Sequence, residues 1–322
     1  MSHQWPRGEA STLDRNVFDS CVERAMAPEH GLTRALLLIQ GGTLVLERYA
    51  HGASPIYLEY SWSMAKSITQ ALVGICVADG RLDLHAPAAV PEWENDARRD
   101  ITLDHLLQMR SGLEFQEDYV DGQISDVIPM LFEGGRHDTG AFAAAKPLIH
   151  PPGSHFSYSS GTTNIICRIL RDLIGGPGEM LELMRQRLFE PAGMRTPTPR
   201  FDTSGTFIGS SFLLATADDF ARFGELYLRD GLWDGNRVLP EGWTRYAAAE
   251  TYADEEQAYG AHWWLHPERR GWYFASGYDG QRIYVVPEKD AVLVRLGRTS
   301  VDHAPPMWAN VERLIDTLPD VE

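Results

Sequence analysis

A serine and a lysine three positions apart, Ser63 and Lys66, are the residues of this chain best suited to covalent chemistry. Residues with this spacing share one face of a helix about one turn apart, so the hydroxyl and the amine would be neighbours. A hydroxyl beside an amine is a nucleophile beside a base. The residues that follow are largely apolar through Ala78, which indicates a buried helix with the pair in its first turn.

The pKa of Lys66 is expected to lie below its ordinary value, because the positive end of the helix dipole and desolvation both disfavour an ammonium group there and push the side chain toward a neutral, base-competent form. Of the 29 lysines and arginines only three are lysine, at positions 66, 146 and 289, so the remaining 26 are arginine. Arginine cannot act as a base, so a lysine at position 66 suggests a role that arginine cannot fill. The spacing also arises by accident, and the motif therefore needs support from elsewhere in the chain.

The second stretch with chemical potential is 156–161, which contains Tyr158 and Ser160. It follows a Pro-Pro-Gly turn and precedes a predicted helix, and such junctions often carry functional side chains. Tyr158 could transfer a proton if a neighbouring Lys66 ammonium lowered its phenol pKa. From spacing alone the alternative is favoured, namely a half-buried tyrosine that serves packing.

The third stretch, 274–281, combines a predicted strand end with a glycine-rich turn. A strand end of this kind can present a backbone N–H to an oxyanion, together with the N–H of Ser63 at its own helix N-terminus. Taken alone, the stretch is more typical of an ordinary β-turn. The three stretches together offer what acyl transfer requires, which is a nucleophile, a base and oxyanion donors.

Other classes of site lack their sequence motif. The chain has no Gly-x-Ser-x-Gly elbow for an α/β-hydrolase triad, and neither His-Glu-x-x-His nor Cys-x-x-Cys for a metal. Glycine-rich nucleotide-binding loops are also missing from it. We therefore expect no metal and no cofactor, and we expect the scattered histidines, including His105 and His262, to be structural.

The composition restricts the partners and the compartment. A formal charge of −16 argues against nucleic acid and anionic membranes; it favours solubility, with a cationic substrate as the alternative. The sequence contains no run of 18 consecutive apolar residues, so it predicts no membrane-spanning helix. The N-terminus lacks the apolar core of a signal peptide. Cys76 and Cys167 lie in apolar runs and are predicted to pack as small hydrophobic residues. We expect a cytoplasmic protein without disulfides and make no prediction of its oligomeric state.

Strand-like runs lie at both ends of the chain and helical runs in the middle. A hairpin is predicted for 35–40 and 43–49, and β-rich runs for 261–265, 272–275, 282–286 and 291–296. Helices are predicted at 16–26, 63–80, 100–109, 125–132, 138–145, 162–174, 179–188, 217–229, 240–249 and 306–318. The pattern predicts an α/β (α+β) fold, in which the hairpin and three C-terminal strands form one antiparallel sheet flanked by terminal helices. The sheet domain would comprise 1–62 and 205–322 and a mainly helical domain 63–204, with the active site between them.

In their order along the chain, these stretches resemble the serine hydrolases of the β-lactamase and penicillin-binding-protein superfamily. Ser63-Met-Ala-Lys66 resembles the nucleophile motif and Tyr158-Ser-Ser160 the Tyr-x-Asn/Ser motif. Ala275-Ser-Gly277 stands where the family has Lys-Thr-Gly or His-x-Gly. Within the superfamily the chain is similar to the class C β-lactamase branch, and there to the amide and ester hydrolases typified by 6-aminohexanoate-dimer hydrolase. The resemblance implies a β-lactamase-like fold.

The resemblance also implies roles for individual residues. Ser63 would form an acyl-enzyme, while Lys66 and Tyr158 would carry the proton to the leaving group. The backbone N–H groups of Ser63 and Tyr278 would hold the oxyanion. A further set of residues would bind substrate nearby: Ser160, Ser276 and Gly277.

The chain departs from the family at Ala275, where the lysine of the family motif helps to bind a substrate carboxylate. The loss removes a charge-assisted contact worth about 1.5–3 kcal/mol and argues against efficient β-lactam or D-Ala-D-Ala chemistry. Ser160 in place of asparagine argues the same way. Several aromatic residues could line an apolar acyl pocket, although each alone is more typical of the core: Trp62, Trp263, Trp264, Trp272 and Tyr278.

The leading prediction is a serine hydrolase that cleaves a small-molecule amide or ester through an acyl-Ser63 intermediate, without a cofactor. The preference between amide and ester stays open. The first alternative is a β-lactamase or D-Ala-D-Ala-type peptidase of the same fold. The second is a protein that uses the cleft only for binding, and the scarcity of lysine makes an unused Lys66 a poor fit to it.

Overall fold

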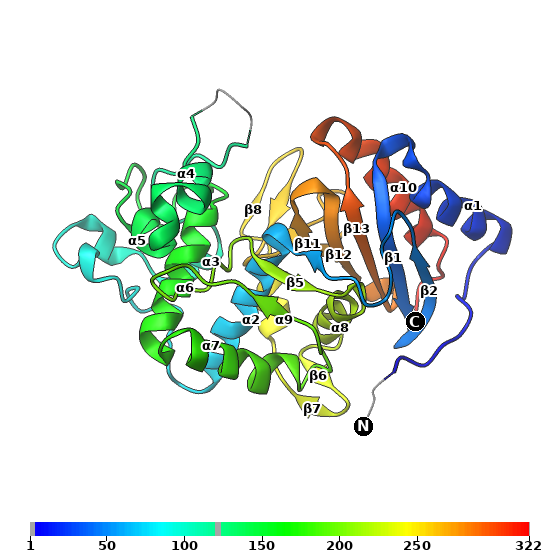
Figure 1. Ribbon diagram of the computed structural model, residues 1–322, viewed down its shortest axis with the longest axis horizontal. Coiled ribbons are helices and arrows are strands. Elements are labelled where there is room, and N and C mark those ends of the chain that lie inside the picture. Colours follow the sequence, from blue (N-terminus) through cyan, green and yellow to red (C-terminus); the bar gives the residue numbers. More distant parts are fainter. Residues whose placement is uncertain (1–3, 120–123, 322) are drawn as a thin grey trace.

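The computed structural model describes residues 4–119 and 124–321, and it contains an eight-stranded antiparallel sheet (Figure 1). The strand order is β2-β1-β13-β12-β11-β10-β9-β8. The strands are β1 (Leu32–Gln40), β2 (Thr43–Tyr49), β8 (Tyr252–Ala253), β9 (Ala258–Tyr259), β10 (Trp264–Leu265), β11 (Tyr273–Gly277), β12 (Gln281–Val286) and β13 (Ala291–Arg298). The N-terminal hairpin therefore joins the C-terminal strands through the β1–β13 pair, and the predicted mixed α/β fold is confirmed.

The sheet is wider than the sequence pattern predicts. Strands β8, β9 and β10 have two residues each, and the predicted run 261–265 forms a strand only at Trp264–Leu265. Segments of two residues show no alternation of apolar and polar side chains, so the pattern cannot reveal them. These short strands extend the sheet beyond β11 on the side of the candidate site.

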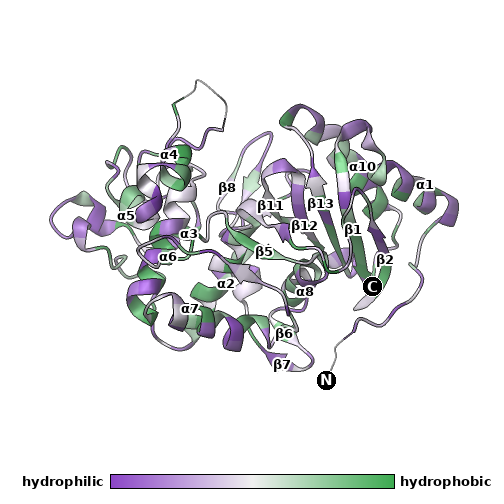
Figure 2. Ribbon diagram, viewed as in Figure 1, coloured by the Kyte–Doolittle hydropathy of each residue, from purple (hydrophilic) through white to green (hydrophobic). Residues whose placement is uncertain are grey.

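Both faces of the sheet are buried, which explains the nearly continuous apolar run of β1. Leu37 and Ile39 belong to the core on one face, and Leu36 and Leu38 to the core on the other. Helix α8 (Ala217–Leu228) contacts β1, β12 and β13, while α1 (Arg15–Met26) and α10 (Ala304–Asp316) pack together on the opposite face. Figure 2 shows hydrophobic residues dominating β1 and hydrophilic residues dominating α1.

The remaining helices confirm most of the predicted positions. They are α2 (Ala65–Ala78), α3 (Leu103–Leu107), α4 (Val127–Phe132), α5 (Thr139–Ala144), α6 (Ser160–Ile174), α7 (Pro177–Leu183) and α9 (Trp243–Ala247). Figure 1 shows α3 to α7 grouped beside the sheet. The division of the chain into two domains stays a prediction. Helix α2 is buried from Ala65 to Cys76, as its apolar sequence predicts, and it contacts α6.

A small second sheet holds the chain just before Ser63. Strand β3 (Glu59–Tyr60) pairs with β5 (Leu213–Ala215), which also pairs with β4 (Thr198–Pro199). A separate hairpin, β6 (Leu232–Trp233) and β7 (Asn236–Arg237), follows α8. The β3–β5 pair ties the entrance of α2 to a segment about 150 residues later in the chain, which gives the site a fixed support.

The composition-based expectations agree with two observations. The three cysteines are buried with free thiols, and Cys76 and Cys167 pack within a hydrophobic core. None of the helices in the described ranges combines the length and apolar character needed to cross a membrane.

Candidate active site

Ser63 lies in a 3₁₀ turn, Trp62–Met64, that leads directly into α2. Trp62 has a φ of 45°, a left-handed conformation that costs energy for a residue with a Cβ atom. Neighbouring backbone holds this turn, because Ser61 N–H donates to Leu213 O at 2.8 Å and Leu213 N–H donates to Ser61 Oγ at 3.2 Å. The turn places Ser63 ahead of the helix, half-buried and at the wall of a cavity.

Lys66 is buried beneath Ser63, with 2 % of its surface exposed. Its Nζ atom lies 3.0 Å from each of three oxygens, namely Ser63 Oγ, Ser160 Oγ and the backbone oxygen of Ser210. Burial lowers the pKa of Lys66 from 10.5 to about 8, and the negative charge of Glu117 opposes this effect. The expected lowering of the Lys66 pKa is therefore confirmed, and the neutral amine becomes accessible just above neutral pH.

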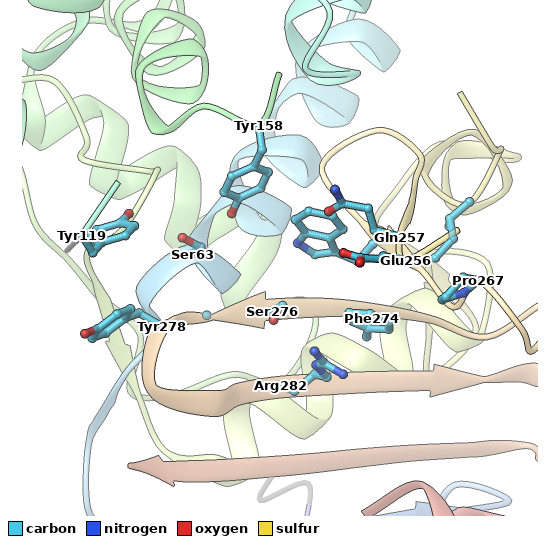
Figure 3. Close-up of a pocket in the computed structure, with 13 residues that line it drawn as sticks. Ser63, Tyr119, Tyr158, Glu256, Gln257, Pro267, Phe274, Ser276, Tyr278 and Arg282 are labelled. Atoms are coloured by element: carbon cyan, nitrogen blue, oxygen red, sulfur yellow. The ribbon is translucent and has the colours of Figure 1, made fainter. Parts of the chain in front are cut away.

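Tyr158 lies opposite Ser63. It directly precedes Ser159, which is the N-cap residue of α6. Its hydroxyl points toward Ser63 in Figure 3, and Lys66 Nζ lies 4.8 Å from the centre of its ring. Burial and then the charge of Glu117 raise the phenol pKa, and hydrogen bonding with Ser63 works in the opposite direction. The conditional expectation that Lys66 lowers this pKa is wrong, because Lys66 lies over the ring face and burial dominates.

Gly277 permits a close approach between the end of β11 and the turn that carries Ser63. A Cβ atom at position 277 would lie 2.4 Å from Ser61 O and 3.1 Å from Trp62 Cβ. Only glycine therefore fits here. The approach brings Tyr278, the residue after β11, to the same cavity as Ser63, and both residues line it.

The end of β11 has a free edge beside this cavity. Within the described chain, β11 pairs with β12 along its whole length, from Tyr273 to Gly277. On its other side it pairs with β10 only at Tyr273 and Phe274. Backbone N–H and C=O groups on an unpaired edge can bind an extended partner, so Ser276 and Gly277 border the cavity as candidates for backbone contacts with a substrate.

The cavity has a volume of about 380 Å³ and is mainly apolar (Figure 3). Its lining residues are Ser63, Tyr119, Tyr158, Glu256, Gln257, Trp264, Leu265, Pro267, Phe274, Ser276, Gly277, Tyr278 and Arg282. Of the aromatic residues named from the sequence, Trp264 and Tyr278 line it. Trp62 packs edge-on against Tyr278, with ring centres 5.6 Å apart, whereas Trp263 and Trp272 are core residues.

Glu117 is a residue of this site that the sequence did not reveal. Its Oε2 accepts a hydrogen bond from Ser160 N–H at 2.7 Å, and its Oε1 accepts one from Ser160 Oγ at 2.5 Å. Tyr119 also donates its hydroxyl to Oε1, at 2.7 Å. Glu117 lies in a segment without regular secondary structure. Neither a motif nor a periodic pattern distinguishes it from the other acidic residues.

Ser160, expected to bind substrate, is fully buried and contacts Lys66 and Glu117 instead of the cavity. His262 is buried between Thr163 Oγ1, at 2.9 Å, and Leu107 O, at 2.8 Å. Burial lowers its pKa to about 3, so it is a neutral structural residue. Among the residues that the structure describes, no cluster of three or more histidine, cysteine, aspartate or glutamate side chains could hold a metal ion.

Arg282 was also missed by the sequence reasoning. It stands opposite Ser276 in the β11–β12 pair and lines the cavity. Its guanidinium group lies 3.6 Å from the ring centre of Trp308 and 4.0 Å from that of Phe274, and Nη1 donates to Tyr284 Oη at 2.7 Å. Arg282 forms no ion pair with any carboxylate in the described ranges, so the cavity contains a positive charge although position 275 is alanine.

The fold and this arrangement define a β-lactamase-type, serine-hydrolase-like protein. Residues 18–312 match the family model described as Beta-lactamase, and the chain belongs to that family. It is 27 % identical over 290 residues to the 6-aminohexanoate-dimer hydrolase of Paenarthrobacter ureafaciens, an alignment that covers 83 % of this chain and 73 % of the relative.

Solved structures show the same fold. A proposed 6-aminohexanoate-dimer hydrolase of Bacillus anthracis superposes with a TM-score of 0.76 and 22 % identity, over 98 % of this chain and 89 % of that one. A penicillin-binding protein of Bacillus halodurans gives a TM-score of 0.70 and 18 % identity, over 92 % and 99 %. The resemblance inferred from the sequence motifs is thus confirmed at the level of family and fold.

Proposed function

We propose that this protein is a serine hydrolase that cleaves a small amide or ester through an acyl intermediate on Ser63. The observation that carries the proposal is the 3.0 Å contact between Ser63 Oγ and the buried Nζ of Lys66, whose pKa is lowered to about 8. A nucleophile within hydrogen-bond reach of a base poised near the working pH is the requirement for nucleophilic catalysis. The family membership supports the same assignment.

The proposed cycle begins when the neutral amine of Lys66 takes the proton of Ser63 while Oγ attacks the carbonyl carbon. Backbone N–H groups of Ser63 and Tyr278 stabilise the negative charge that develops on the carbonyl oxygen. Tyr158 then gives a proton to the departing amine or alcohol. A raised pKa suits that role, because the phenol is protonated at neutral pH, and the proton that Lys66 took from Ser63 then restores the phenol. Water finally attacks the acyl carbon while the neutral Lys66 amine accepts its proton, and that proton passes to Ser63 Oγ as the bond to the acyl group breaks and the acid product leaves.

The cavity supports a small substrate with an apolar portion, because about 380 Å³ of largely apolar space adjoins Ser63. The name of the Paenarthrobacter relative denotes hydrolysis of an amide dimer, which supports amide cleavage here as well. Simple esters share the same acyl chemistry, so both classes belong to the proposal. The expectations of a cytoplasmic location, no cofactor, and no nucleic-acid or membrane partner are also part of it.

A second candidate is a β-lactamase or D-Ala-D-Ala-type peptidase, supported by the fold shared with a penicillin-binding protein. Alanine at position 275 argues against efficient activity of this kind, and among the described residues that line the cavity Arg282 is the one cation. A non-catalytic binding protein is a third candidate. It gives no reason for a buried lysine with a lowered pKa beside Ser63.

The test compares wild type, Ser63→Ala and the control Ser154→Ala on p-nitrophenyl acetate and on a fluorophosphonate probe. Ser154 is exposed and lies outside the set of residues that line the cavity, and its hydroxyl donates a hydrogen bond to Pro151 O, so its removal leaves the site intact. We expect turnover and labelling in wild type and in Ser154→Ala, and neither in Ser63→Ala. Retained turnover in Ser63→Ala would refute the assignment of the nucleophile, and a wild type that neither turns over nor labels would favour a binding protein.

A further inference from the structure

A chain of hydrogen bonds connects Ser63 to a carboxylate outside the catalytic set. Lys66 Nζ lies 3.0 Å from both Ser63 Oγ and Ser160 Oγ, and Ser160 Oγ lies 2.5 Å from Glu117 Oε1. Ser160 and Lys66 are buried, with 0 % and 2 % of their surfaces exposed. Bulk water therefore has almost no access to these two side chains, and the directions of their hydrogen bonds follow from counting hydrogens.

The Ser160 hydroxyl has a single hydrogen, which it donates to Glu117. A carboxylate oxygen has no hydrogen to give, so Ser160 must be the donor in the 2.5 Å contact. The second carboxylate oxygen accepts the backbone N–H of the same serine, at 2.7 Å, which fixes the carboxylate in place. Ser160 Oγ can therefore meet Lys66 only as an acceptor.

This direction determines where the lone pair of a neutral Lys66 points. The amine then has two hydrogens and one lone pair, and it has three oxygen neighbours. Ser210 contributes a carbonyl oxygen, which only accepts, and Ser160 accepts for the reason given above. Both hydrogens are thereby used, and the lone pair faces the third neighbour, Ser63 Oγ, whose proton it is placed to receive.

We infer that Glu117 is a positioning residue that aims the Lys66 lone pair at Ser63 by holding the Ser160 hydroxyl in one orientation. This inference rests on the proposed function, because it concerns the base that activates Ser63. Glutamine at position 117 would keep the volume but carry a donor and an acceptor in place of two acceptors. Its NH₂ group would either oppose the N–H of Ser160 or donate to Ser160 Oγ. The second arrangement turns the Ser160 hydrogen toward Lys66, where it competes with Ser63 for the lone pair.

The experiment measures the rate of inactivation by a fluorophosphonate across pH 6 to 10 for wild type, Glu117→Gln and Glu114→Gln. Glu114 is exposed in the same segment, so its variant is a control for the same change of charge. We expect Glu117→Gln to lower the high-pH plateau about tenfold or more, since a positioned general base contributes roughly a hundredfold or more to such rates. Its acid limb should also move to lower pH, because the charge of Glu117 raises the pKa of Lys66. Glu114→Gln should change neither.

Ser160→Ala separates orientation from charge. It removes the hydroxyl but keeps the Glu117 carboxylate, so we expect the plateau to fall while the acid limb moves less than in Glu117→Gln. When Glu117→Gln is added to Ser160→Ala, it should change the high-pH plateau less than about twofold. The Ser160 hydroxyl through which Glu117 acts on Lys66 is already absent from that protein. Circular dichroism and thermal midpoints identify folded variants, and Ser160→Ala still tests the inference if Glu117→Gln does not fold.

The inference is overturned if the high-pH inactivation rate of Glu117→Gln equals that of Glu114→Gln. It is overturned as well if Glu117→Gln lowers this rate as much in protein that carries Ser160→Ala as in protein that keeps Ser160. It is also overturned if Ser160→Ala reacts as fast as wild type. These outcomes differ from failure of the proposed function, in which wild-type protein does not label or Ser63→Ala still labels.

Discussion

Replacing Lys66 by methionine should change the pH dependence of stability in a way that can be calculated from the structure. The folded pKa of about 8 lies below the ordinary value of 10.5, so the unfolded chain binds more protons than the folded one between these pH values. Stability contributed by Lys66 therefore rises with pH through this window and falls as pH drops toward 8. At roughly 1.4 kcal/mol per pKa unit, the full effect is about 3 kcal/mol.

Urea unfolding of wild type and Lys66→Met at pH 7 and pH 10 measures this effect. Methionine has a similar length and no charge, so it removes the titration while preserving most of the packing. Other titrating groups are common to both proteins and cancel in the difference between their unfolding free energies. We expect wild type to gain about 2–3 kcal/mol relative to the variant on going from pH 7 to pH 10.

The lost hydrogen bonds of Lys66 add an offset to the comparison, but that offset is nearly the same at both pH values. The diagnostic quantity is therefore the change with pH and not the stability of the variant itself. An equal free-energy difference at pH 7 and pH 10 would refute the reasoning, because it would mean that Lys66 titrates alike in the folded and unfolded chains.

Four further predictions concern the site. The rate of fluorophosphonate labelling should rise with pH around a midpoint near 8, the pKa of Lys66, and a rate without a limb in this range would argue against a lysine base. Nitrocefin should be turned over slowly or not at all because position 275 is alanine; rapid, saturable turnover followed at its absorbance change would favour the β-lactamase alternative. Arg282→Met should raise KM about tenfold for a p-nitrophenyl monoester of a dicarboxylic acid, because the variant loses a charged hydrogen bond to the free carboxylate. KM for p-nitrophenyl butyrate, which has no such carboxylate, should stay unchanged. Equal effects on the two substrates would exclude Arg282 as a carboxylate contact. Gly277→Ala should abolish labelling of Ser63, because its Cβ would lie 2.4 Å from a backbone oxygen of the nucleophile turn, and normal labelling in a folded variant would show that this approach is dispensable.

The sequence predicted the elements that have a long periodic pattern or a local motif. The β1–β2 hairpin, α2 and the longer C-terminal strands β11, β12 and β13 follow from apolar runs and turn residues, whereas the two-residue strands β8 to β10 do not. Ser63 and Lys66 could be paired before the structure was known, because their contact lies within one helical turn and depends only on spacing three.

The rest depends on contacts between distant segments. Glu117 reaches Ser160 across 43 residues and Lys66 reaches Ser210 across 144, and no local pattern encodes either distance. The pKa of Tyr158 was misjudged for the same physical reason. Spacing indicates that a charge is near, but the geometry decides whether Lys66 faces the hydroxyl or the ring.

The central claim is that Ser63 carries the acyl group, and peptide mapping by mass spectrometry after brief exposure to p-nitrophenyl acetate and acid quenching tests it most directly. We expect one acetyl group on the peptide that contains Ser63 in wild type, and none on that peptide in Ser63→Ala. An acetyl group on another residue during productive turnover, with Ser63 unmodified, would contradict it.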